Sequence, residues 1–166
     1  NMGTAGTLQF LAGTSIRAKI GGNNELQEVG FTLKADYTAP VSGVMPAGLK
    51  VNLDIPDAKY TTDLGGSFDG SGKITLKDDC DVKPFSALTI KLKKNGSLSG
   101  ELQKTELKKA EGSVDFEAKL KLFGETEANV EGKIKADYTG AEGGGTFGGE
   151  IDAKLKSNVT IAAPEG

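Results

Sequence analysis

Apolar and polar residues alternate with period two along most of the chain. In residues 114–122 every even position is apolar, and every odd position is charged. Such alternation predicts an antiparallel strand with one face buried and the other in water. The same rule returns in residues 128–138 and 147–155, separated by turn-forming residues near 124–126 and a glycine-rich loop over 139–145. These three segments predict an antiparallel meander.

The N-terminal half follows the rule less regularly. Residues 8–12 and 16–20 predict one broken strand or two short strands, and residues 29–37 and 49–55 predict two more, the second stopped or placed at an edge by Pro56. Turn-rich residues follow, and Asp69-Gly70-Ser71-Gly72 is expected to close a hairpin. Residues 104–111 are the single candidate for a helical turn.

Residues 88–102 contain a second predicted hairpin. A two-residue turn at Asn95-Gly96 would break the facing of the apolar side chains. A three-residue loop over residues 94–96 instead pairs Leu92 with Leu98, so side-chain facing favours the longer loop. Together the segments predict one all-β domain over residues 1–166, an antiparallel meander of about ten strands forming a barrel or a two-sheet sandwich.

Many inward positions of the predicted strands carry small residues. In a barrel, small inward residues permit strong strand coiling and leave room for a guest, whereas in a sandwich they allow two sheets to approach closely. The sequence leaves both architectures open. The positions are Gly100, Ala118, Gly132, Ala136, Gly149 and Ala153.

Charge and residue types narrow the range of functions. The chain has 20 basic and 23 acidic residues, a net charge of −3, and Arg17 as its one arginine. Nucleic-acid binding proteins concentrate positive charge and use arginine for base and phosphate contacts, so no nucleic-acid partner is expected. Histidine is absent, which removes the commonest general base and metal ligand. Cys80 is the one cysteine, and it predicts a small apolar side chain rather than a disulfide or thiolate cluster.

The remaining chemical motifs do not fit known sites. Asp78, Asp79 and Asp81 lie close in sequence, but their spacing does not match a calcium-binding loop. The glycine runs of residues 143–145 and 148–149 lack the following helix and Lys-Ser/Thr pair of a phosphate loop. We therefore expect a protein that is not an enzyme, with no catalytic residue, cofactor or metal site.

Membrane association is not expected from the sequence. No stretch of about 18 apolar residues is present, and the first residues do not resemble a signal peptide. An outer-membrane barrel would need aromatic girdles, and the chain has seven Phe, three Tyr and no Trp. The sequence does not fix the compartment, although an extracellular or surface location is favoured.

Two classes of function remain. The first is a structural protein that assembles with copies of itself, using the uncharged segment around Leu8, Phe10 and Leu11 as an added strand. Deletion of residues 1–11 is then expected to abolish assembly and to leave a folded monomer. The second is a barrel that binds a small apolar ligand or another protein, with Tyr37, Tyr138 and Phe147 near a cavity mouth.

Overall fold

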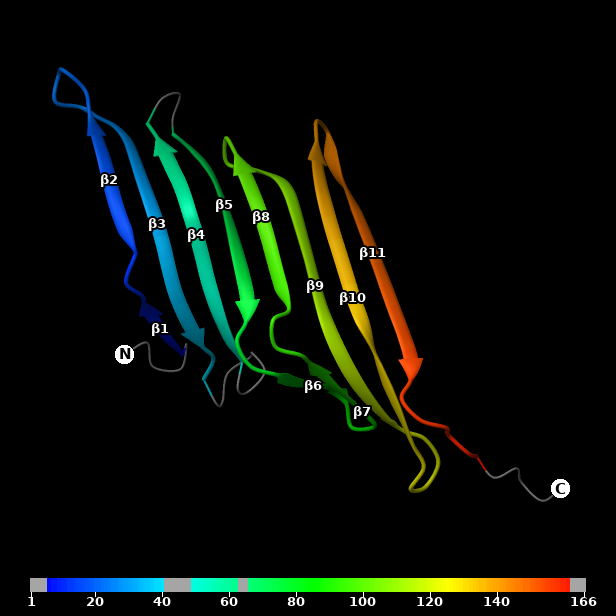
Figure 1. The fold of residues 1–166 in the computed structure, drawn as a ribbon. Helices are drawn as coiled ribbons and strands as arrows, with labels where there is room; N and C mark the ends of the chain where they lie inside the picture. The colour runs from blue at the N-terminus through cyan, green and yellow to red at the C-terminus, as the bar shows by residue number, and fades with distance from the viewer. Residues whose placement is uncertain (1–5, 41–48, 63–65, 162–166) are drawn as a thin grey trace.

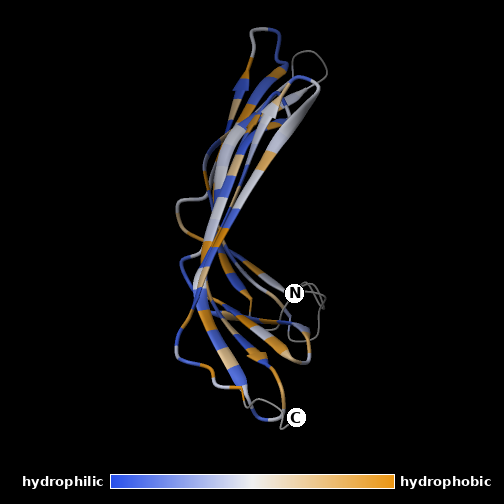
Figure 2. Cartoon of the chain, turned by 90° about the vertical axis from the view of Figure 1, so that its right-hand side faces the viewer, coloured by the Kyte–Doolittle hydropathy of each residue, from blue (hydrophilic) through white to orange (hydrophobic). Residues whose placement is uncertain are grey.

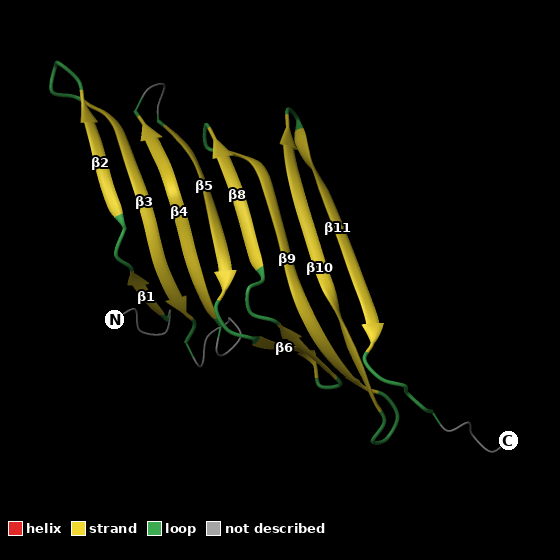
Figure 3. Cartoon of the chain, viewed as in Figure 1, coloured by secondary structure: helices red, strands yellow, loops and turns green. Residues whose placement is uncertain are grey.

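The computed structural model describes residues 6–40, 49–62 and 66–161, which form eleven strands and no helix (Figure 1, Figure 3). The predicted all-β, antiparallel class is confirmed. In chain order the strands are β1 (Thr7–Phe10), β2 (Ser15–Ile20), β3 (Leu26–Thr38), β4 (Lys50–Thr61), β5 (Ser67–Leu76), β6 (Cys80–Phe85), β7 (Leu88–Leu92), β8 (Ser97–Gln103), β9 (Glu106–Lys121), β10 (Glu127–Ala141) and β11 (Gly144–Leu155).

All eleven strands belong to one sheet, ordered β1-β3-β4-β5-β8-β9-β10-β11. β2 also pairs with β3, and the β6–β7 hairpin joins the sheet through β9. The sheet therefore begins at β1 and β2 and ends at β11, and no pairing between described residues joins these two edges. The sheet is not closed into a barrel, and the described strands form one sheet rather than the two of a sandwich.

The predicted meander is confirmed in β9, β10 and β11. Ile134 of β10 lies between Val114 of β9 and Ile151 of β11, so the apolar sets face the same side. The glycine-rich loop is shorter than expected, because β10 runs to Ala141 and β11 starts at Gly144. Gly143, at φ +81°, provides the left-handed conformation that this tight turn needs.

In the first half of the chain, β1 and β2 are two short strands, one of the two predicted alternatives. Pro56 does not stop its strand, since β4 continues through it to Thr61. The pairing of β4 with β5 shifts register between Asp54 and Asp57, and an irregularity of this kind accommodates a residue without an N–H. The Thr32 hydroxyl donates a hydrogen bond of 2.8 Å to the Pro56 carbonyl at this point.

The predicted hairpin of residues 88–102 is wrong. Leu92 pairs with Cys80 and Phe116, whereas Leu98 pairs with Ile74 and Gly112. After β7 the chain moves away, and β8 lies between β5 and β9. Every strand here has an apolar face, so side-chain facing alone did not identify the partner strands.

Two further turn predictions are wrong. Residues 69–72 lie inside β5, where they pair with both β4 and β8. Most of residues 104–111 belong to β9 rather than to a helical turn. Lys104 and Thr105, at φ +50° and +67°, form a two-residue turn between Gln103 and Glu106. Two positive φ values in succession are unusual outside glycine and asparagine, so the residue types at these positions did not indicate a turn.

The sheet is a single bent layer with a small core. In side view the layer is bent along the direction of its strands, so that its upper and lower parts incline toward the same side (Figure 2). Among the described residues the buried hydrophobic ones are Ala35, Ala39, Ala58, Cys80, Phe116 and Ala128. Phe116 is the only large side chain in this set.

Candidate self-association surface

One face of the sheet is apolar from β1 and β2 across to β11. Cross-strand neighbours on this face are Ile16 and Phe31, Leu53 and Ile74, Leu98 and Gly112, and Ile134 and Ile151. No described helix or second sheet covers this face. Among the described residues, fifteen large hydrophobic side chains are exposed. Those of β2 and β11 are among the most exposed: Ile16 76%, Ile20 65%, Phe147 82%, Ile151 69% and Leu155 55%.

The solvent-accessible surface area is also larger than that of a compact protein. The chain exposes 11630 Å² for a mass of 17.2 kDa. A compact monomer of that mass exposes about 7,800 Å², so this structure exceeds the expected area by roughly half. Single exposed apolar residues are ordinary on protein surfaces, but a continuous apolar face of this extent usually marks an interaction surface.

The apolar face is hollowed between β3, β4, β5, β8 and β9. The hollow has a volume of about 490 Å³. Its lining includes three glycines, Gly70, Gly72 and Gly100, together with large apolar side chains such as Phe31, Leu102 and Leu107. A hollow of this size could hold a small apolar molecule.

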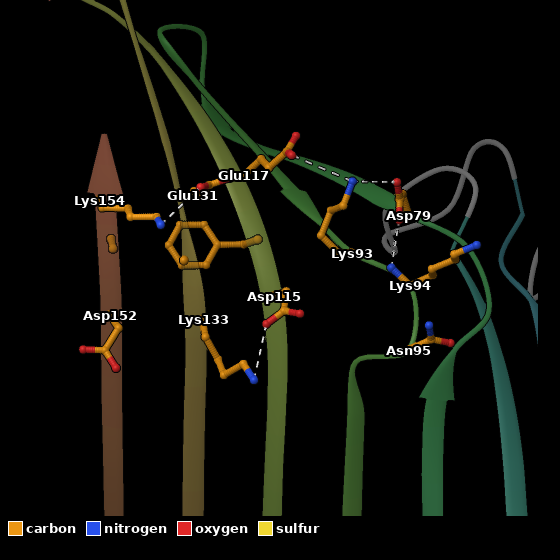
Figure 4. A pocket seen from close by; sticks show the side chains of 13 residues that line it. Asp79, Lys93, Lys94, Asn95, Asp115, Glu117, Glu131, Lys133, Asp152 and Lys154 are labelled. Carbon is orange, nitrogen blue, oxygen red and sulfur yellow. Dashed lines mark hydrogen bonds and ion pairs between the residues drawn. The ribbon is translucent and has the colours of Figure 1, made fainter. Parts of the chain in front are cut away.

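The opposite face carries cross-strand ion pairs between lysines and acidic residues. Figure 4 shows part of it, a hollow of about 790 Å³ over β9, β10 and β11. Lys133 lies 3.6 Å from Asp115, and Lys154 lies 3.7 Å from Glu131. Most of these side chains are well exposed, so each pair contributes little stability. The pattern keeps this face in water.

Two acidic residues beside this hollow are held in the charged form. The main-chain N–H of Lys94 donates to Asp79 over 2.8 Å, and the Lys93 ammonium donates over 3.2 Å. These bonds lower the pKa of Asp79 below its ordinary value. Lys156, at 3.2 Å, lowers the pKa of Glu117 in the same way, with Lys93 as a weaker cause.

Two more carboxyl groups elsewhere behave similarly. Asn52 and then Lys77 lower the pKa of Asp36, through hydrogen bonds of 2.9 and 2.6 Å. Lys108 lowers the pKa of Glu106. A carboxyl group that stays ionised is a poor general acid at neutral pH, so these four residues are suited to ion pairing rather than to proton donation.

Cys80 carries a thiol, which is a potential nucleophile. Its side chain is buried at the start of β6, and burial raises the pKa of its thiol, with the Asp81 charge as a second cause. A raised thiol pKa makes the reactive thiolate scarce. Within the described ranges, no group of three or more Cys, Asp or Glu residues is arranged to hold a metal ion. The same residues contain no helix with the length and apolar character needed to span a bilayer.

The residues predicted for self-association lie at the first edge of the sheet. Leu8 and Phe10 are in β1, opposite Tyr37 and Ala35 of β3, and Phe10 is 61% exposed. Leu11 follows the strand, and its N–H donates to the Lys34 carbonyl. The other side of β1 pairs with no described strand, as strand addition requires.

The residues predicted for ligand contact do not come together. Tyr37 lies in β3 beside Leu8, whereas Tyr138 and Phe147 are neighbours in β10 and β11 with ring centroids 4.8 Å apart. The two groups occupy opposite ends of the sheet (Figure 1). None of the three lines the 490 Å³ or the 790 Å³ hollow.

The sequence analysis did not predict that β2 and β11 form the two edges of the sheet. The alternation of β2 and β11 was recognised, but a binary pattern does not say which strands end a sheet. The available signal was charge: β2 carries Arg17 and Lys19, whereas Glu150 and Asp152 lie in the middle of β11. Comparisons with known protein families, with curated proteins and with solved structures find no match for this chain.

Proposed function

We propose that this chain is a non-enzymatic structural protein that assembles with copies of itself. The observation that carries the proposal is a one-layer sheet whose apolar face no described helix or second sheet covers and whose two edges pair with no described strand. Covering apolar surface is worth about 25 cal/mol per Å², and a standard interface needs about 800 Å² from each partner. The surface in excess of a compact monomer is several times that area.

Edge strands of soluble monomers are usually protected by charges, prolines, bulges or covering segments. β2 has one irregularity, at Ile20, and the charged side chains of β2 and β11 lie on the polar face. Neither strand contains proline, and no described residue covers the outer side of either strand. Ile16 and Ile151 are strongly exposed in these edges. Assembly with further copies would satisfy the main-chain groups and shield the apolar side chains.

The proposal is tested with a charge placed on the apolar face. Ile151→Lys should lower the oligomer mass, measured by light scattering, because a lysine in a buried interface is costly. Ile151 is 69% exposed, so the monomer should still fold, which circular dichroism checks. Thr146→Lys is the matched control, since it adds the same charge to the opposite face of β11. Unchanged assembly of Ile151→Lys would contradict the proposal.

The second candidate function is binding of a small apolar molecule. It is favoured by the 490 Å³ hollow between Phe31, Leu53 and Leu102. An apolar fluorescent dye should then bind with defined stoichiometry, and Leu102→Lys should remove that binding. Binding to a stable monomer would favour this function over assembly.

A further inference from the structure

We propose that β2 of one copy adds to the β11 edge of a second copy, in the register that places Arg17 opposite Asp152. This inference rests on the proposed assembly function and names the surfaces and the register it would use. It follows from three independent properties of the two edges: the direction of their free main-chain groups, the facing of their side chains, and their charges.

In β2, alternate residues direct their main-chain N–H and C=O groups outward, away from β3. Leu11 donates to the Lys34 carbonyl, so the even-numbered residues of β3 bond toward this edge. Arg17 and the other odd-numbered residues of β2 pair with those even-numbered residues, up to the irregularity at Ile20. Alternate residues of a strand point their N–H and C=O groups to opposite sides. Ile16 and Ala18 therefore direct theirs outward, away from β3.

In β11, alternate residues likewise direct their main-chain N–H and C=O groups outward, away from β10. The Lys156 N–H donates to the Asn129 carbonyl over 2.8 Å, so even-numbered residues in this part of the chain bond to β10. Odd-numbered residues, including Ile151 and Ala153, consequently direct their main-chain groups outward. In both edges the outward set is also the set with apolar side chains.

These two properties allow the edges to pair. An antiparallel arrangement with Ala18 opposite Ile151 and Ile16 opposite Ala153 joins the outward main-chain groups and keeps all four side chains on the apolar face. A slip of one residue would break both relationships. A slip of two residues would preserve both the main-chain pairing and the side-chain facing. The registers that remain therefore differ only in which charged residues they place opposite one another.

Charge favours this register. It places Arg17 opposite Asp152 and Lys19 opposite Glu150, while a slip of two residues in either direction retains only one cation–anion pair. Among the described residues, Lys19, Glu150 and Asp152 have no ion pair or side-chain hydrogen bond. Arg17 contacts Asp57 at 3.4 Å through side chains that are 56% and 83% exposed. The charges are therefore available to a partner.

The direction of the strands fits repeated addition. β2 and β11 run in opposite directions in the sheet (Figure 1). A second copy placed beside the first thus meets β11 with an antiparallel β2 and continues the apolar face on the same side. Such a head-to-tail contact leaves a free β2 and a free β11 at the ends of each dimer, so it can extend into a ring or a filament.

Cysteine cross-linking between two different chains tests the register. Ser15 would lie opposite Lys154 in a pair without mutual hydrogen bonds, where Cα atoms are about 4.5 Å apart, within the range of a disulfide. Ser15→Cys and Lys154→Cys chains, each in a Cys80→Ala background, are mixed and oxidised. Their heterodimer should form at least about tenfold faster than that of Ser15→Cys with Thr146→Cys, on the same face of β11 but off register.

A charge exchange gives a second test. Asp152→Arg should raise the concentration for half-maximal assembly by about threefold or more, and Arg17→Asp in the same chain should restore it. Oligomers that form without the cross-link and without sensitivity to Asp152→Arg would overturn this register but leave self-assembly standing. Monomers at every concentration would overturn both. A chain with both Ser15→Cys and Lys154→Cys that forms an internal disulfide as a monomer would show that the two edges close on each other, which also overturns the proposal.

Discussion

Phe116 of β9 and Gly132 of β10 are direct cross-strand partners, and Phe116 is the largest side chain in the small core. A Cβ atom on Gly132 would overlap the main-chain oxygen of Asp152 in β11. The glycine therefore lets β11 approach β10 closely, and Phe116 lies opposite the glycine in β9.

Gly132→Ala should loosen β11. Because the added methyl group meets main-chain atoms that cannot rotate away, we expect a loss of about 1–3 kcal/mol in the free energy of unfolding. Urea unfolding measures the loss, and hydrogen exchange should show it first in β11. Gly22→Ala is the control, since nothing lies within 4 Å of a Cβ there. Equal stability of both variants would contradict this account.

Phe116→Ala should cost more. The side chain is 8% exposed, and removing a buried phenylalanine typically costs about 3–5 kcal/mol. Phe123→Ala removes the same atoms from a side chain that is 76% exposed and should change stability by less than about 0.5 kcal/mol. Thermal or urea unfolding of the two variants compares a core position with a turn position. A similar loss in both would show that the core lies elsewhere.

Acid should weaken the fold through the paired carboxylates. Asp79, Glu117, Asp36 and Glu106 all have a pKa below the ordinary value because of hydrogen bonds to nitrogen donors. A lowered folded-state pKa gives stability that is present above the unfolded-state pKa, near 3.8 for Asp and 4.5 for Glu, and that is lost as the pH falls through the folded-state value. The urea midpoint should therefore fall as the pH drops below about 4.5.

Asp79→Asn isolates the contribution of one carboxylate to the loss of stability in acid. It removes the carboxylate that Lys93 and Lys94 hold, so part of the acid-dependent fall in the urea midpoint should disappear. Asp81→Asn is the matched control, because Asp81 has no hydrogen bond or ion pair to a described residue. If the two variants keep the same pH dependence as the unmodified chain, the ion pairs of this face do not determine its response to acid.

Deletion of residues 1–11 should reduce assembly. It removes β1, whose outer side pairs with no described strand, together with Leu11 and the exposed side chain of Phe10. Circular dichroism and light scattering should report a folded chain of lower mass. A truncated chain that assembled as well as the full chain would exclude β1 from the interface.

The sequence predicted strands better than it predicted their partners. The alternation in 114–122, 128–138 and 147–155 was enough for β9, β10 and β11, because these strands pair in sequence order, the commonest arrangement for consecutive strands. The pairing of Leu92 with Leu98 failed because residues far apart in the chain compete: β8 lies between β5 and β9. Lys104 and Thr105 failed for a local reason, since neither residue type favours the positive φ that it adopts.

The candidate surface was predicted in part. Leu8 and Phe10 do lie in an edge strand, as strand addition requires, whereas Tyr37 and Tyr138 are at opposite ends of the sheet. An edge is defined by the absence of a further partner, and that is a property of the whole sheet rather than of one segment. The charges of β2 and β11 were visible in the sequence, but their meaning depends on both strands being at edges.

The concentration dependence of the mass in solution tests the central claim most directly. Sedimentation velocity or light scattering of the unmodified chain should show a mass that rises above 17.2 kDa with concentration, since further copies would pair with the free edges and shield the apolar side chains along them. A mass that stays at 17.2 kDa over the whole accessible range would contradict self-assembly.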